Sequence, residues 1–494
     1  HAGHAARAGV DEFLRARRGG MGREHGRGQR FEPRFEPRHR ARFDPCDAPL
    51  PSSHQPSARE TAARDRSRHA VIVGAGLAGC ATAWALAQQG WTTSLLDRCA
   101  AVAQEASGNL AGAFHGIVNS QDGAHARFNR AAALRAQRVI AQAVQSGAVA
   151  GNLNGLLRLE SRTPDIAAMR ATVQALGLPD DYVRVLDAAQ ASQLSGVSLH
   201  HPAWLYPGGG CVDPAALARH FLELSRGACT LRTGTHVAKI RRHADVWQLV
   251  DSSGELIEEA HTVVLCNAAD ALRLLGHPEW PLRSLRGQVS MLPVAAWPSG
   301  SAPPRVAITG EGYVLPQVNG KILFGATASP ADTDPAVRAC DHRSNLERLA
   351  RMLPLGQPLP GDALRGRVGW RCASMDRLPV IGAVPREEPS SAARDAQPRW
   401  VAREAGLFVF IGLGSRGITW SPLGASLLAS CITGAPAPVQ ASLIDAVDPA
   451  RFVTRRARRI ATGTPSPAQP QATIHSASPR PRRRCWSATN TSKL

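Results

Sequence analysis

One stretch of the chain, residues 71–97, contains in order every part of a β-α-β unit that binds dinucleotides. A β-branched apolar run predicts a buried strand, a glycine-rich turn follows, and an Ala-rich helix leads to a second strand. The turn contains Gly74, Gly76 and Gly79 at the spacing GxGxxG. The second strand ends at Asp97, 18 positions beyond Gly79. An acidic side chain meets a ribose hydroxyl at a spacing of about 20 in such units.

The chemistry of a bound pyrophosphate explains these residue types. Without Cβ atoms, Gly74 and Gly76 let the backbone turn sharply and approach a phosphate, which the positive end of the helix stabilises. Gly79 lets the helix pack closely against the strand. The apolar run over 70–87 would also suit a membrane helix. The glycine spacing and the acid on the next strand favour a nucleotide site.

The positive charge of the chain is concentrated near its two ends. The 494 residues carry a formal net charge of +19. Residues 1–70 contribute 15 arginines against 9 acids, and residues 451–494 contribute 10 basic residues and no acid. Both ends are rich in Pro, Ser and Arg, so we expect 1–68 and 456–494 to be disordered. The charge is therefore poor evidence that the folded part binds nucleic acid.

Cysteine usage and the absence of a leader pattern favour a reduced, cytoplasmic protein. The ten cysteines show no CxxC or Cys/His ligand spacing, so we expect no metal site. No secretory signal opens the chain, and we expect no membrane association. The alternative location is peroxisomal, because the chain ends in Ser492-Lys493-Leu494.

Helices and strands continue beyond the first unit. Helices are predicted over 124–146 and 214–225, and an Asp-Pro pair suited to an N-cap opens the second. Strands are predicted over 229–241, 246–250 and 256–266. The last ends in small and polar residues, as does the third parallel strand of a nucleotide domain where it meets its ligand.

The second half of the chain carries an antiparallel pattern and another glycine turn. Apolar and polar residues alternate over 286–325, and a helix follows near 342–353. Gly412 and Gly414 then form a turn that opens a final helix over 418–430. Because this turn lies more than 300 residues after the first, the nucleotide domain is predicted to be discontinuous. The predicted fold class is α/β with an α+β insert: a discontinuous Rossmann-type domain with an inserted antiparallel-sheet domain.

This arrangement resembles the D-amino-acid oxidase and glycine oxidase superfamily of flavoproteins. Four strings narrow the resemblance to the FAD-dependent oxidoreductase half of the MnmC family, whose bifunctional members modify the tRNA wobble uridine. The strings are EASGNLAGAFHGIVNS, YPGGGCVDPAALAR, GWRCASMDRLPVIG and GLFVFIGLGSRGITWSPLGASLLAS. With the first unit they cover roughly residues 70–455 in the right order. About 70 residues precede the first strand, too few for the methyltransferase half, so a separate methyltransferase partner is one expectation.

The resemblance implies FAD as cofactor and tRNA as substrate. The oxidoreductase half of the family removes the carboxymethyl group from 5-carboxymethylaminomethyl-(2-thio)uridine, giving the 5-aminomethyl base and glyoxylate. An enzyme for this reaction must orient a carboxylate, which suits a bidentate arginine. Arg371 occupies the position where the superfamily carries its carboxylate-binding arginine. Tyr313 is expected to share the carboxylate or line the flavin face, although a buried core tyrosine explains it equally well.

The remaining candidate residues are expected to bind FAD. A loop after the first unit is expected to border the pyrophosphate, and the second glycine turn to face the flavin or the ribityl chain. Three histidines, His115, His200 and His201, receive no role because the chain has 17 histidines. The full cofactor set is Gly74, Gly76, Gly79, Asp97, Ser107, Gly108, Asn109, Gly412, Gly414, Ser415 and Arg416.

The resemblance also sets the predicted domain boundaries. The oxidoreductase is expected over 69–455, with FAD-binding parts at about 69–145, 206–270 and 365–450 and substrate parts at about 150–205 and 271–364. Two other functions stay open. One is a glycine or D-amino-acid oxidase that acts on free amino acids with the same arginine. The other is a non-catalytic remnant that binds flavin or RNA.

Overall fold

The computed structural model describes residues 68–461 except 163–164, 299, 301, 358 and 387–396. Most of the two segments predicted to be disordered, and the terminal Ser-Lys-Leu, lie outside the described residues. Helix α11 (Ala450–Ala461) continues past position 455, where the prediction placed the end of the oxidoreductase. The predicted fold class is confirmed, because a mainly parallel sheet and a larger, mainly antiparallel sheet make up most of the fold.

The first β-α-β unit forms the centre of a six-stranded sheet. Helix α2 (Leu77–Ala87) joins β1 (His69–Val73) to β2 (Thr92–Leu96), and the two strands are parallel. As predicted, the third strand, β13 (Thr262–Leu265), pairs in parallel with β1. The sheet has the order β20-β21-β13-β1-β2-β9 and is completed by β20 (Val380–Pro385), β21 (Arg403–Ile411) and β9 (Cys229–Arg232).

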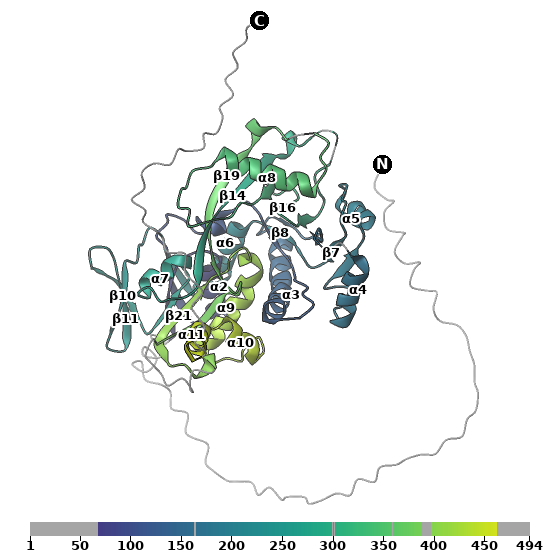
Figure 1. Cartoon of the computed structure of the whole chain (residues 1–494). Coiled ribbons are helices and arrows are strands. Elements are labelled where there is room, and N and C mark those ends of the chain that lie inside the picture. The colour runs from purple at the N-terminus through teal and green to yellow at the C-terminus, as the bar shows by residue number, and fades with distance from the viewer. Residues whose placement is uncertain are drawn as a thin grey trace, which may run out of the picture. The chain divides into compact units, whose positions relative to one another are not determined.

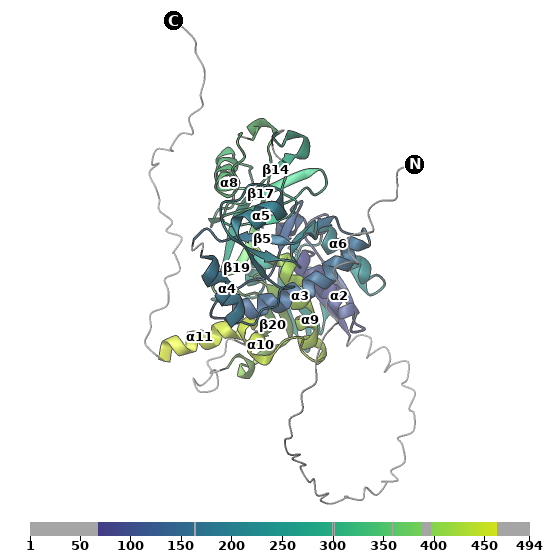
Figure 2. The ribbon, with the colours of Figure 1, turned by 90° about the vertical axis from the view of Figure 1, so that its right-hand side faces the viewer.

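Successive residues of β1 face two different cores. Ala70 and Ile72 pack in the core that contains α2, together with α3 (Ala124–Gln145), α6 (Pro214–Leu224) and α9 (Gly417–Thr433). Figure 2 shows α2, α3 and α9 side by side. Val71 and Val73 pack in a second core with Trp247. Trp247 belongs to a small antiparallel sheet of β10 (Lys239–His243), β11 (Val246–Val250) and β12 (Leu256–Ala260).

Two predicted strands are each divided between two sheets, which corrects the sequence prediction. The run predicted over 229–241 forms β9 in the parallel sheet and β10 in the small sheet. Gly234, with φ of +64°, lies between them in a conformation that a regular strand does not contain. The run predicted over 256–266 forms β12 and β13 in the same two sheets. The pattern of apolar and polar residues did not reveal where either run divides, because both parts of each run form strands.

A nine-stranded sheet forms the inserted region. Its longest strand, β14 (Leu282–Pro293), pairs antiparallel with β17 (Lys321–Gly325) and with β19 (Arg365–Ser374). Strand β19, which opens the range 365–450 predicted to bind FAD, pairs within this sheet. Helix α8 (Ala339–Met352) lies against β14 (Figure 1) and against β17 (Figure 2). The other strands are β18 (Ser329–Pro330), β16 (Tyr313–Val314), β15 (Ala307–Thr309), β5 (Leu156–Leu159), β7 (Ala203–Tyr206) and β6 (Arg184–Leu186).

The remaining elements are short. A three-stranded sheet contains β3 (Gly112–Phe114), β8 (Gly210–Val212) and β4 (Gly151–Asn152). The other α-helices are α4 (Ile166–Ala175), α5 (Ala188–Ser195), α7 (Ala271–Leu274) and α10 (Ala441–Val447). The 3-10 turns of the described residues are η1 (Ala106–Gly108), η2 (Ala268–Asp270), η3 (Val294–Ala296), η4 (Gly361–Ala363) and η5 (Pro398–Trp400). Within the described part of the chain, no helix is long and apolar enough to cross a membrane.

Candidate active site

The two predicted glycine turns meet at one cavity. Gly74 and Gly76 line it from the first turn, and Gly412 and Gly414 line it from the second. The cavity has a volume of about 770 Å³, and residues of both large sheets contribute to its wall. Cofactor pockets commonly measure about 300–1,000 Å³. The two glycine turns, which are far apart in the sequence, therefore lie at one site, as the sequence predicted.

The first turn is tight because its three glycines have no side chains. Gly74 has φ of +106°, and a Cβ on it would lie 2.9 Å from the backbone of Asn267 at the end of β13. A Cβ on Gly79 would lie 1.8 Å from the carbonyl oxygen of Gly74. Gly79 does not line the cavity, so its role is close packing of α2 against the turn. Leu77 and Ala78, at the amino end of α2, line the cavity.

Asp97 lines the cavity just after β2 and stabilises the same turn. Its carboxylate accepts hydrogen bonds from the backbone N–H of Ala75 at 2.6 Å and of Cys99 at 2.8 Å. A carboxylate has about four lone-pair sites, so acceptor capacity remains for a ribose hydroxyl.

The predicted pyrophosphate loop lies beside the start of α2. Ser107 and Asn109 line the cavity, whereas Gly108 does not. The hydroxyl of Ser107 accepts the backbone N–H of Leu77 at 3.1 Å and so caps an amide at the beginning of α2.

Arg367, which was not among the predicted site residues, fixes this loop from β19. Its guanidinium donates to the carbonyls of residues 104 and 105, both at 2.7 Å, and to Oδ1 of Asn109 at 3.1 Å. A Cβ on Gly108 would lie 2.5 Å from Nη2 of Arg367. The available signal was strand periodicity, because Arg367 and Arg371 lie four positions apart and face the same side of β19.

The second turn presents another helix N-terminus to the cavity. Gly412 and Gly414 have φ of +75° and +54°, and Ser415 and Arg416 also line the cavity. Helix α9 begins directly afterwards, so the positive end of its dipole faces the same space. The backbone N–H of Gly414 donates to the carbonyl of Cys372 at 2.7 Å, which joins the turn to β19.

Arg371 places a charged guanidinium in the cavity wall. Its Nη2 donates to the carbonyl of Thr327 at 2.7 Å, and no carboxylate of the described residues lies within ion-pair distance. Burial lowers the pKa of Arg371, Tyr313 opposes that shift, and the nearby charge of Arg348 adds to it. An arginine nonetheless stays protonated in a protein. Several N–H donors are therefore free to bind an anion.

Tyr313 faces the same part of the cavity. Burial raises the pKa of Tyr313 to about 12, although the charge of Arg371 acts in the opposite direction. Its hydroxyl therefore remains protonated at physiological pH and can donate a hydrogen bond. The structure brings both predicted catalytic residues to one cavity with the predicted cofactor turns.

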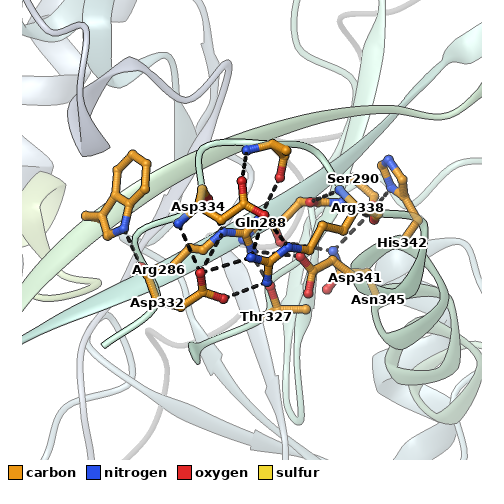
Figure 3. A network of polar contacts seen from close by, with 12 residues as sticks. Arg286, Gln288, Ser290, Thr327, Asp332, Asp334, Arg338, Asp341, His342 and Asn345 are labelled. Atoms are coloured by element: carbon orange, nitrogen blue, oxygen red, sulfur yellow. Dashed lines mark hydrogen bonds and ion pairs between the residues drawn. The ribbon is translucent and has the colours of Figure 1, made fainter. Parts of the chain in front are cut away.

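A network of charged side chains fixes the loop that carries Thr327 (Figure 3). The backbone N–H of Gln288 donates to Oγ1 of Thr327 at 3.0 Å. Arg286, which is fully buried, donates to Asp341 at 2.7 Å and to the carbonyls of residues 334 and 336. Arg338 forms ion pairs with Asp332 and Asp334. The loop backbone is thereby held so that the Thr327 carbonyl faces Arg371.

Of the three histidines left without a role, one lines the cavity. His115 follows β3, whereas His200 and His201 lie elsewhere. Burial and then the charge of Arg416 lower the pKa of His115 to about 3. Its imidazole is therefore neutral at physiological pH.

The cavity suits a dinucleotide. Two helix N-termini face it, and such termini bind phosphates and other negative groups. At the end of β13, Oδ1 of Asn267 is buried and has no hydrogen-bond donor among the described residues, although its Nδ2 donates to Asp270 at 3.1 Å. A bound ligand would supply the missing donor. No group of three or more His, Cys, Asp or Glu in the described chain is placed to hold a metal ion.

These features define a protein of the dinucleotide-binding class. Residues 69–431 match the family model described as FAD dependent oxidoreductase, and the chain belongs to this family. Its cofactor is FAD.

The chain is also similar to curated proteins that share one name. The tRNA 5-methylaminomethyl-2-thiouridine biosynthesis bifunctional protein MnmC of Methylibium petroleiphilum is 47% identical over 431 residues, which are 85% of this chain and 64% of that protein. The protein of the same name from Burkholderia thailandensis is 41% identical over 405 residues, covering 80% of this chain and 61% of that protein. The chain thus spans a little under two thirds of the length of these relatives.

Solved structures share the fold. Glycine oxidase from Geobacillus kaustophilus matches with a TM-score of 0.61 and 21% identity, over 77% of this chain and 98% of that one. Iminodiacetate oxidase from Chelativorans sp. BNC1 matches with a TM-score of 0.57 and 23% identity, over 77% of this chain and 98% of that one.

Proposed function

We propose that this FAD-dependent oxidoreductase removes the carboxymethyl group from 5-carboxymethylaminomethyl-(2-thio)uridine at the tRNA wobble position. The products are the 5-aminomethyl base and glyoxylate. The observation that carries the proposal is the guanidinium of Arg371, which lies in the cavity wall beside Tyr313 without a carboxylate partner among the described residues. The similarity to the MnmC proteins supports tRNA as the substrate.

We assign the cofactor contacts to the two glycine turns. The amides at the start of α2 would bind the pyrophosphate, with Ser107 and Asn109 beside it and Asp97 on the ribose. The backbone from Gly412 to Arg416 would face the flavin or the ribityl chain. Gly79 and Gly108 act through packing, since neither lines the cavity.

The substrate arm, –CH2–NH–CH2–COO⁻, sets the task of the side chains. Arg371 binds the carboxylate through two parallel N–H bonds, and the hydroxyl of Tyr313 donates a further one. Together they orient the glycine-like carbon so that one C–H bond points toward the flavin position. The Thr327 carbonyl holds the guanidinium in this position by accepting a hydrogen bond from its Nη2.

Bound FAD supplies a two-electron acceptor. The substrate carbon loses a hydride and its nitrogen loses a proton, so a C=N bond forms. Water then adds to that carbon, the C–N bond breaks, and glyoxylate leaves while the base keeps the amine. A neutral substrate amine needs no strong base, in keeping with the neutral state of His115. The aminomethyl product is an acceptor for methylation by a separate methyltransferase, and a tRNA substrate places the reaction in the cytoplasm.

Nucleoside mass spectrometry tests this function. Purified, FAD-loaded protein is incubated with tRNA that carries the carboxymethylaminomethyl base, and the digested nucleosides and glyoxylate are quantified. We expect conversion to the aminomethyl base with an equal amount of glyoxylate. An unchanged base, together with oxidation of free glycine, would instead identify an amino-acid oxidase.

A further inference from the structure

His115 offers the cavity a hydrogen-bond acceptor that no residue of the described chain uses. The ring lines the cavity, and its Nδ1 lies 2.5 Å from the carbonyl oxygen of Gly116. Because a carbonyl oxygen can only accept, Nδ1 carries the proton of the neutral ring and Nε2 keeps its lone pair. Burial lowers the pKa of His115 to about 3, so Nε2 stays unprotonated. No described residue donates a hydrogen bond to Nε2.

Neighbouring residues fix the position of this ring. The ring of Tyr206 lies 5.3 Å from it, measured between centroids. Asn129, which is fully buried in α3, donates from Nδ2 to the backbone carbonyl of His115 at 3.1 Å. Farther along the chain, the hydroxyl of Tyr182 accepts the N–H of Ile117 at 3.0 Å and donates to its carbonyl at 3.1 Å. An acceptor that is already held in place loses little freedom when a donor binds.

Tyr206 and Tyr313 lie on one face of the nine-stranded sheet. Strands β5 and β15 lie between their strands, β7 and β16, and the register across all four places both side chains on the same side. Tyr206 accordingly belongs to an apolar cluster against which Tyr313 packs. Three strand intervals separate the two tyrosines, which is about 14 Å at the usual spacing of strands. His115 packs against Tyr206 at one end of this face, and Tyr313 marks the other end.

The proposed substrate matches this separation. With its carboxylate held by Arg371 and Tyr313, the arm –CH2–NH–CH2–COO⁻ is attached to C5 of the uracil ring. Six covalent bonds join the carboxylate carbon to N3 of that ring, and with a hydrogen bond at each end the extended span is on the order of 13 Å. The amine of the arm is only two bonds from the carboxylate carbon and falls short of His115. The group that reaches His115 is therefore the base.

Uracil carries a hydrogen-bond donor at N3, and His115 carries an acceptor. A donor that is removed from water without finding an acceptor costs free energy, and Nε2 supplies that acceptor. Cytosine has an unprotonated N3 at the same position. Two lone pairs would then face each other, and both groups would be left without a partner.

We propose that Nε2 of His115 accepts a hydrogen bond from the imide N3–H of the substrate base and makes the site selective for uracil over cytosine. The proposal rests on the proposed function, because that function supplies the base. It gives the protein a contact with the nucleobase in addition to the contact of Arg371 with the arm. The isoalloxazine ring of FAD also carries an imide N–H, so the test must distinguish the base from the cofactor.

The test measures binding without turnover. The probe is 5-(carboxymethylthiomethyl)uridine, in which sulfur replaces the amine so that no C=N bond can form. Its dissociation constant on the FAD-loaded protein is measured from flavin absorbance and by calorimetry, and is compared with that of the matching cytidine. We expect the uridine probe to bind at least tenfold more tightly.

Two variants of His115 give opposite results. His115→Phe keeps the packing against Tyr206 and removes both nitrogens, so the uridine probe should bind about tenfold more weakly and the selectivity should disappear. The side-chain amide in His115→Gln can accept from uracil or donate to cytosine. This variant should therefore recover affinity for the uridine probe and gain affinity for the cytidine probe, which a purely structural role would not produce.

His125→Phe is the matched control. His125 is a partly buried histidine of α3 whose ring lies 6.2 Å from that of Trp420, and it does not line the cavity. Its replacement should leave the selectivity unchanged.

Equal selectivity in His115→Phe and the parent protein, both with full flavin content, would overturn the proposal. So would failure of both probes to bind the parent protein. Loss of FAD from His115→Phe with the selectivity retained would assign Nε2 to the flavin imide instead. If modified tRNA is not a substrate but the selectivity is lost in His115→Phe, the proposed function fails and the contact with uracil stands.

Discussion

Gly287 makes room for the guanidinium of Arg371. A Cβ on Gly287 would lie 2.3 Å from Nη2 of Arg371 and 3.0 Å from the carbonyl oxygen of Thr327. Gly287 is on β14 opposite Gly369 of β19, and both glycines line the cavity. The position of the proposed carboxylate anchor thus depends on a missing side chain in the neighbouring strand.

Gly287→Ala should displace Arg371 without unfolding the protein, because the clashing group is the end of a flexible side chain. We expect kcat/KM for the modified tRNA to fall at least about tenfold, equivalent to about 1.4 kcal/mol. Flavin content should stay at the parent level. Gly361→Ala is the control, since a Cβ there meets nothing within 4 Å. Unchanged kcat/KM in Gly287→Ala would contradict the proposed role of Arg371.

Gly79→Ala should act on the cofactor instead. Its Cβ would lie 1.8 Å from a rigid backbone atom, the carbonyl oxygen of Gly74, so the turn that faces the pyrophosphate must move. We expect most of the FAD to be lost on purification, as measured by the ratio of flavin to protein absorbance. Gly123→Ala, at an open position before α3, should retain it. Full flavin occupancy in Gly79→Ala would show that the turn does not bind the cofactor.

Tyr313→Phe should weaken substrate binding by the loss of one hydrogen bond. We expect KM to rise about threefold to tenfold, which corresponds to a loss of about 1 kcal/mol of substrate-binding free energy. Flavin content should stay unchanged. Because burial raises the pKa of Tyr313 to about 12, the hydroxyl donates throughout the working range. The pH profiles of kcat/KM for parent and variant should therefore be parallel from pH 6 to 10. A bend in the parent pH profile that is absent from the Tyr313→Phe profile would show that Tyr313 titrates in this range.

Asp376 links the strand that carries Arg371 to helix α11, and acid should weaken this link. Its carboxylate pairs with Arg451 at 2.9 Å and with Arg455. Burial alone would raise the pKa of Asp376, but the hydrogen bonds and charge of Arg451 outweigh it and lower the pKa well below the usual value. The stabilisation is therefore complete above the unfolded pKa of about 4 and is lost as pH falls toward the folded value.

Asp376→Asn should consequently lower the free energy of unfolding at pH 7 by about 2–4 kcal/mol, nearer the lower value because Asp376 is partly exposed. Urea unfolding at pH 7 and at pH 3 would measure the difference between parent and variant. We expect that difference to shrink at the lower pH. If parent and variant differ in unfolding free energy by the same amount at pH 7 and at pH 3, the ion pair is not the cause of the difference.

The sequence predicted the parts of the site that depend on local backbone chemistry. Both glycine turns were found because a sharp turn and close backbone approach require glycine at fixed spacing. Arg371 was found through the resemblance. By contrast, the contact of Arg367 with the loop before Asn109 joins residues more than 250 positions apart. The strand spacing from Arg371 places Arg367 on the same face, but it does not identify a partner so distant in the sequence.

The strand breaks at Gly234 and His261 were missed for a related reason. Each run forms a strand on both sides of its break. The sequence pattern of a strand does not reveal the sheet in which that strand pairs. The buried pair of Arg286 and Asp341 was likewise invisible, since charged residues are expected at the surface unless their partners are known.

Anaerobic reduction of the bound flavin tests the central claim most directly. The protein is mixed without oxygen with an anticodon stem-loop that carries the carboxymethylaminomethyl base, and flavin absorbance near 450 nm is followed as a marker of the oxidised cofactor. Our account predicts rapid bleaching by this RNA, little by glycine, and none by the RNA in Arg371→Ala with FAD still bound. Bleaching by the RNA in Arg371→Ala at the parent rate would contradict this account. So would rapid bleaching by glycine together with no bleaching by the RNA in the parent protein.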